Sequence, residues 1–142
     1  MTFSSAWQFW AVLSALFAAL TAIFAKVGVE NIGADLATFI RTLVVIALLA
    51  AILLAGGQCQ SPASIPAKTW LFLVLSGLAT GASWLCYFRA LKIGQAAQVA
   101  PIDKLSVVLV AIFGVVFLGE KLALLNWLGI ALIAAGAILV AL

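Results

Sequence analysis

Hydrophobic residues gather into five long segments, separated by short stretches that are richer in polar residues. The segments cover residues 7–27, 34–55, 69–89, 97–118 and 123–142. A helix rises about 1.5 Å per residue, so about 20 residues cross a hydrocarbon layer that is about 30 Å thick. Each segment reaches this length. The pattern therefore predicts an all-α membrane protein whose fold is a bundle of five transmembrane helices.

The composition supports a membrane environment and a single domain. Hydrophobic residues make up 68% of the 142 residues, charged residues make up 8%, and the mean hydropathy is +1.36. A soluble domain of this length lacks the buried volume to cover five such helices on all sides. The longest stretch between segments, 56–68, is rich in Gly, Pro, Ser and Gln and is typical of a flexible connector. We therefore expect one transmembrane domain, 1–142, with membrane lipid as its surroundings.

Residues that carry catalysis or bind metal ions are scarce. The chain has no histidine, and its two cysteines, Cys59 and Cys86, lie far apart. These features argue against a metal site, a disulfide framework and the usual general-base arrangements of enzymes. We expect no catalytic residue, no bound metal and no cofactor. The net charge of +3 is ordinary for membrane loops and gives no sign of a nucleic-acid partner.

The positive charges near the segment ends suggest an orientation in the bilayer. Lys26, Arg89 and Lys92 lie on one side, and Lys68 and Lys121 lie on the other. Cytoplasmic loops carry the excess of lysine and arginine, so this count favours an N-terminus outside and a C-terminus inside. The difference in positive charge between the two sides is small. A chain that inserts in both orientations would require such a small difference.

Three charged residues lie inside the predicted helices at a similar depth. Arg41 is seven residues into the second segment, and Asp103 and Lys104 are six and seven residues into the fourth. The helical rise puts all three about 10 Å below the cation-rich interface, where an unpartnered charge is costly. Long side chains can stretch back to water, so Arg41 and Lys104 are either membrane anchors or part of a polar cavity. Asp103 is too short to reach back, and we expect it to pair with Arg41 or a neighbouring cation.

A proline and an aromatic stripe accompany these charges. Pro101 removes one backbone hydrogen bond and deprives the carbonyl of Ala97 of its usual donor, unless the proline falls in the tolerated first turn. Trp84, Tyr87 and Phe88 form a stripe on the third segment that either packs in the bundle or stacks against substrate. We expect the substrate pathway to run past six residues: Arg41, Trp84, Tyr87, Gln98, Asp103 and Lys104.

The last third of the chain carries a series of short motifs. An aromatic residue, Tyr87, is followed by Ala90 and Leu91, and a Leu-Gly-Glu-Lys turn occupies 118–121. A helix of the form Leu-Gly…Leu-Ile…Ala-Gly then covers 128–136. These motifs resemble the EamA-like branch of the drug/metabolite transporter superfamily, and the resemblance extends over essentially the whole chain. In the turn, Glu120 is expected to cap the helix that follows it.

The resemblance implies a transporter of small metabolites or toxic compounds, most often an exporter, in the cytoplasmic membrane of a prokaryote. Typical relatives have ten helices in two five-helix repeats of opposite orientation, whereas this chain is similar to the short type with one repeat. Two copies paired antiparallel would restore the two repeats, and a parallel homodimer with the N-terminus outside is the alternative. Small residues that allow close backbone approach predict a dimer interface on the last helix, at Gly129, Ala131, Ala135 and Gly136.

The expected mechanism is alternating access by the homodimer, acting on an unidentified small molecule. Two other functions stay open on the sequence, namely a non-transporting accessory or assembly subunit and a flippase of a lipid-linked substrate. Polar residues that face one another at membrane depth favour the transporter, whereas charges that all reach the headgroups favour the accessory subunit.

Overall fold

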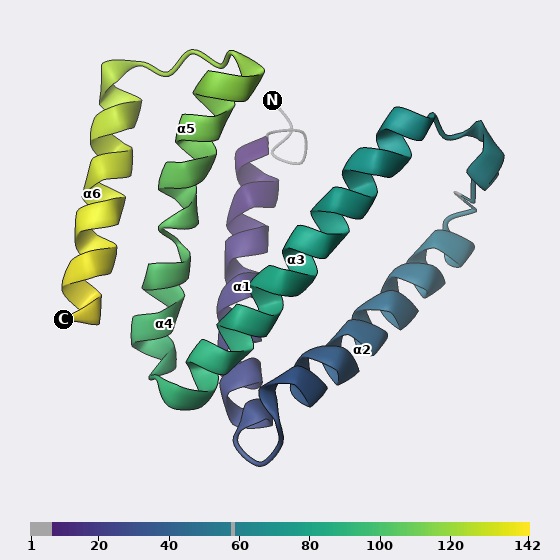
Figure 1. Cartoon of the computed structure of the whole chain (residues 1–142), viewed down its shortest axis with the longest axis horizontal. Coiled ribbons are helices and arrows are strands. Elements are labelled where there is room, and N and C mark those ends of the chain that lie inside the picture. The colour runs from purple at the N-terminus through teal and green to yellow at the C-terminus, as the bar shows by residue number, and fades with distance from the viewer. Residues whose placement is uncertain (1–6, 58) are drawn as a thin grey trace. The chain divides into compact units, whose positions relative to one another are not determined.

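The computed structural model describes residues 7–57 and 59–142, and this part of the chain contains helices and no strand (Figure 1). The helices are α1 Trp7–Val29, α2 Ala34–Ala55, α3 Ala67–Ile93, α4 Ala96–Asp103, α5 Ser106–Leu118 and α6 Leu124–Ala141, with a short 3₁₀ helix at Pro62–Ser64. Five stretches are long and apolar enough to cross a membrane, because α4 and α5 together form one span, Ala96–Leu118. The predicted all-α fold with five membrane-spanning segments is confirmed.

The main differences from the predicted boundaries lie at α3 and in the fourth span. The third segment was expected at 69–89, but α3 runs from Ala67 to Ile93. Its last turn is held by a hydrogen bond of 2.7 Å from Lys26 Nζ to the carbonyl of Leu91, one of the final carbonyls that lack a donor within the helix. The predicted connector 56–68 includes the 3₁₀ helix and the start of α3, and its residue 58 lies outside the described residues.

The chain divides into two compact units. One consists of Met1–Ile23 together with Ile93–Leu142, and the other consists of Phe24–Lys92. The single domain over 1–142 stays a prediction, and each unit is described on its own.

In the first unit, α6 packs along α4 and α5 (Figure 1). Ala137 of α6 and Gly114 of α5 are buried in this unit. Small residues let helix backbones approach closely, which is how helices associate when lipid removes the usual hydrophobic driving force. Most large apolar side chains of these helices are exposed in the chain, as expected for surfaces that face acyl chains or other helices.

The turn between α5 and α6 depends on Gly119, whose φ of +69° lies in the left-handed region that favours glycine. The backbone N–H groups of Gly119 and Glu120 both donate to the carbonyl of Gly114. The Glu120 carboxylate folds back over Gly114, so a Cβ atom at position 114 would lie 2.6 Å from its Oε2. The expectation that Glu120 caps the next helix is therefore wrong. Ala123 precedes α6, and within the described range this helix has no side-chain cap.

Candidate site in the membrane-spanning helices

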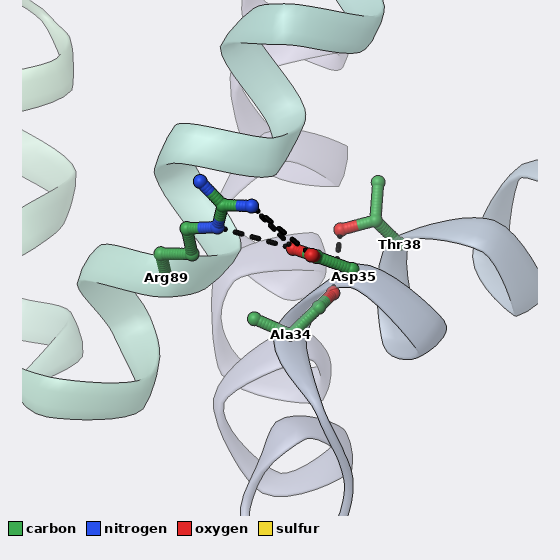
Figure 2. Close-up of polar contacts among 4 residues, drawn as sticks. All are labelled: Ala34, Asp35, Thr38 and Arg89. Atoms are coloured by element: carbon green, nitrogen blue, oxygen red, sulfur yellow. Dashed lines mark hydrogen bonds and ion pairs between the residues drawn. The ribbon is translucent and has the colours of Figure 1, made fainter.

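A bidentate ion pair joins α2 to α3 near one end of the second unit (Figure 2). Asp35 lies in the first turn of α2, where the helix dipole favours a carboxylate. Nε of Arg89 donates to Oδ1 of Asp35 at 3.1 Å, and Nη2 donates to Oδ2 at 3.0 Å. The Thr38 hydroxyl, one turn further along α2, is buried and donates to the carbonyl of Ala34 at 2.8 Å. At this end of the unit, the side chains of Asp35, Arg89 and Thr38 therefore each have a hydrogen-bond partner.

Arg41 lies one turn beyond Thr38 and contacts aromatic rings of α3. The guanidinium carbon is 3.9 Å from the centroid of the Trp84 ring and 5.5 Å from that of Phe88. Both distances are within the range of cation–π attraction, and the shorter one is typical of a guanidinium stacked face to face on an indole. Phe88 is buried, while Arg41 and Trp84 are half-buried.

The position of these rings indicates that the Arg41 side chain does not extend toward the nearer end of α3. Trp84 lies nine residues before the end of α3, which is about 13 Å along the helix, whereas Phe88 lies five residues before it, about 7 Å. The guanidinium is closer to the ring of Trp84, which lies further from the end of α3 than Phe88 does. Of the two roles open to Arg41 on the sequence, membrane anchor and polar site, the contact favours the second.

The aromatic stripe of α3 contacts the charge of Arg41 on α2. Trp84 and Phe88 hold the Arg41 guanidinium, and Tyr87 between them is half-buried. Because Trp84 and Phe88 are four residues apart, they share one face of α3, and that face is turned toward Arg41 of α2. The contact therefore depends on the register between the two helices, which the Asp35–Arg89 pair also sets.

The fourth span is interrupted at membrane depth. Pro101 is the sixth residue of α4, so the first-turn alternative is wrong, and the helix ends two residues later at Asp103. Across the break, the N–H of Leu105 donates to Ile102 and that of Val107 donates to Lys104, each over three residues and at 3.0 Å. These tight turns replace the regular four-residue pattern between α4 and α5.

Asp103 and Lys104 form an ion pair at this interruption. Nζ of Lys104 lies 3.2 Å from Oδ2 of Asp103, which confirms the predicted pairing of Asp103 with a neighbouring cation. Successive residues of a regular helix point about 100° apart, and the end of α4 at Asp103 relaxes that constraint. Each charge also suits a helix end, since Lys104 follows the C-terminus of α4 and Asp103 precedes the N-terminus of α5 at Ser106.

The structure thus brings together two groups of predicted pathway residues, Arg41 with Trp84 in one unit and Asp103 with Lys104 in the other. Gln98 is exposed on α4, one turn before Ile102. The pathway through all six residues stays a prediction. Sequence reasoning missed Asp35, although an acid in the first turn of an apolar span at the same end as Arg89 was a usable signal.

The predicted dimer residues fall on two faces of α6. Gly129 and Gly136 are seven residues apart and share one face, while Ala131 and Ala135 share another, about 130° away. Gly136, Ala131 and Ala135 are exposed in the chain, and a Cβ atom added at Gly129 or Gly136 would meet nothing within 4 Å among the described residues. A second helix can approach either face, and the interface itself stays a prediction.

Comparison with known proteins agrees with the resemblance drawn from the motifs. Residues 5–142 match the EamA-like transporter family. A protein of Sinorhizobium sp named "Uncharacterized transporter in cobO 3'region" is 70% identical over 138 residues, which are 97% of this chain and 98% of that protein. "Uncharacterized transporter YxxF" of Bacillus subtilis (strain 168) is 30% identical over 128 residues, which are 89% of this chain and 40% of that longer protein. No solved structure matches the chain.

Proposed function

The chain belongs to the EamA-like transporter family and is a multi-pass membrane transporter; on this premise, we propose that it exports small metabolites or toxic compounds across a prokaryotic cytoplasmic membrane. Transport proceeds by alternating access in a homodimer. The observation that carries the proposal is the broken fourth span, with its ion pair at membrane depth. The outward direction is what the family resemblance implies.

Broken helices at membrane depth are a recurrent feature of transporter binding sites. Non-helical backbone inside a bilayer is tolerated where it meets protein or lines a water-filled cavity, and half-helix ends there attract charged groups. Asp103 and Lys104 lie at such ends, and their side chains keep 36% and 55% of their surface exposed. An ion pair exposed to acyl chains would be costly, so the exposure supports contact with water or solute.

A homodimer is supported by the length of the relatives. The chain matches 98% of one relative and 40% of the other, which fits one repeat of a protein built from two. Two copies in opposite orientation reproduce the inverted repeats of such transporters, and we propose this antiparallel pair over the parallel one. The exposed small residues of α6, Ala131, Ala135 and Gly136, supply a surface for close approach.

The test is solute flux in proteoliposomes that contain the purified protein, measured for a panel of small metabolites and toxic compounds. Asp103→Asn removes the charge with little change in shape, and we expect it to abolish flux while the dimer still forms. Glu30→Gln is the matched control, because it neutralises an exposed carboxylate in the turn after α1, and it should leave flux unchanged. Wild-type protein that moves no member of the panel, or Asp103→Asn protein with full flux and normal expression, would contradict the proposal.

A further inference from the structure

The cations of the helices differ in how their charge is balanced. Arg89 pairs with Asp35 in the second unit, and Lys104 pairs with Asp103 in the first. Arg41 contacts the rings of Trp84 and Phe88 instead. Within the described residues of Phe24–Lys92, no carboxylate lies within ion-pair distance of its guanidinium.

Asp35 lies on the same helix as Arg41, but its carboxylate is already paired with Arg89. Its two carboxylate oxygens accept from Nε and Nη2 of Arg89, and it precedes Arg41 by six residues, which is not a neighbouring spacing on a helix. The attraction of the rings offsets only part of the cost of holding the Arg41 charge inside an apolar span. The balance favours binding of an additional anion.

The geometry of the stack leaves the hydrogen-bonding groups of Arg41 available. A guanidinium that lies over a ring uses its flat face, while its five N–H groups point outward in the plane. Two adjacent N–H groups match the two oxygens of a carboxylate or a phosphate, which is the strongest arrangement that arginine makes. The Arg41 guanidinium carbon lies 3.9 Å from the centroid of the Trp84 ring, so Trp84 holds the group against α3.

We propose that Arg41 binds the carboxylate or phosphate group of the transported solute, with Trp84 and Phe88 holding the guanidinium in position. This assignment rests on the proposed transport function and adds to it the sign of the substrate, an organic or inorganic anion. A cationic solute would be repelled by Arg41, and a neutral solute would leave its charge unbalanced.

The experiment compares four probes on the purified protein: inorganic phosphate, benzoate, benzamide and benzylamine. A ligand that binds only the folded state raises the midpoint of thermal unfolding, and above its Kd the rise grows with the logarithm of the ligand concentration. We expect phosphate and benzoate to raise the midpoint and to compete with solute flux, while the neutral amide and the amine do neither. Arg41→Gln should weaken binding of the anions by about tenfold or more, and Arg41→Lys should weaken it less, since lysine keeps the charge and loses the paired donors. Lys68→Gln, in the first turn of α3, is the control that should retain binding.

Two lipid compositions distinguish binding of a solute anion from binding of a lipid headgroup. The protein is reconstituted in vesicles of phosphatidylglycerol and in vesicles of an uncharged galactolipid, because a lipid phosphate offers the same chemistry as a solute phosphate. Anion binding that depends on Arg41 in both lipids supports the assignment. Binding seen only in galactolipid would mean that Arg41 holds a lipid headgroup and would overturn it, as would flux of solutes that neither anion inhibits. Absence of all flux with intact anion binding would contradict the transport function and leave the anion site standing.

Discussion

The contact between Arg41 and Trp84 can be measured as an interaction free energy. The guanidinium carbon lies 3.9 Å from the indole centroid, and both residues are half-buried. Cation–π pairs contribute about 0.5–1 kcal/mol at exposed sites and about 2 kcal/mol when desolvated, so an intermediate site should contribute about 1 kcal/mol. This corresponds to about a fivefold change in the unfolding equilibrium constant.

The perturbation is a double-mutant cycle of Arg41→Gln and Trp84→Leu. Each single variant loses packing as well as the contact, and the cycle removes those common losses. The assay is reversible unfolding by SDS in mixed micelles, followed by far-ultraviolet circular dichroism. Phe72→Leu combined with Arg41→Gln is the control, because Phe72 lies twelve residues before Trp84 on α3, about 18 Å along the helix.

We expect a coupling of about 1 kcal/mol for Arg41 with Trp84 and none beyond error for Arg41 with Phe72. A coupling of zero in the first cycle would refute the reasoning, because it would mean that the guanidinium does not lie against the ring in the folded protein. Arg41 would then be free to reach the interface as a membrane anchor, and its assignment as an anion site would lose its geometric basis.

Three other predictions concern the turn, the dimer and the orientation. Gly119→Ala should destabilise the protein by about 1 kcal/mol in the same SDS assay, because φ is +69° there, whereas Gly129→Ala within α6 should be neutral or stabilising. Gly136→Leu should reduce chemical crosslinking of the dimer, and unchanged crosslinking would place that face of α6 against lipid. Reporter fusions at the C-terminus should be active on both sides of the membrane if the copies pair antiparallel, and activity on one side alone would exclude this arrangement.

The span count followed directly from the sequence, because hydrocarbon thickness and helical rise set a length that five apolar segments meet. The positions of Arg41 and Asp103 within their spans followed in the same way, since each is a count of residues along one span. The pairing of Asp103 with a neighbouring cation could be expected from its short side chain. The end of α4 two residues after Pro101 could not, because the missing N–H of a proline affects the turn before it.

The contacts between helices could not be predicted in this way. Whether Arg41 meets Trp84 depends on the rotation and register of α2 against α3, and neither is encoded in the periodicity of one helix. The same register decides that Asp35 meets Arg89, and Asp35 was overlooked because an acid in a first turn is ordinary on its own. The fold-back of Glu120 over Gly114 was missed because it requires the left-handed Gly119. Hydrophobic patterning gives the faces and lengths of helices, and side-chain packing decides which faces meet.

The central claim is that the charges of the fourth span line a route open to water. The most direct measurement is the reactivity of single cysteines with a membrane-impermeant maleimide in intact vesicles, with Cys59 and Cys86 replaced by serine. Ser106→Cys lies just after the Asp103–Lys104 pair and is exposed, whereas Ile112→Cys lies six residues further along α5, about 120° around the helix, and is also exposed. We predict labelling of Ser106→Cys and none of Ile112→Cys, since a thiol reacts only where water allows it to ionise. Equal protection of both positions would contradict the account, because the broken span would then lie in lipid.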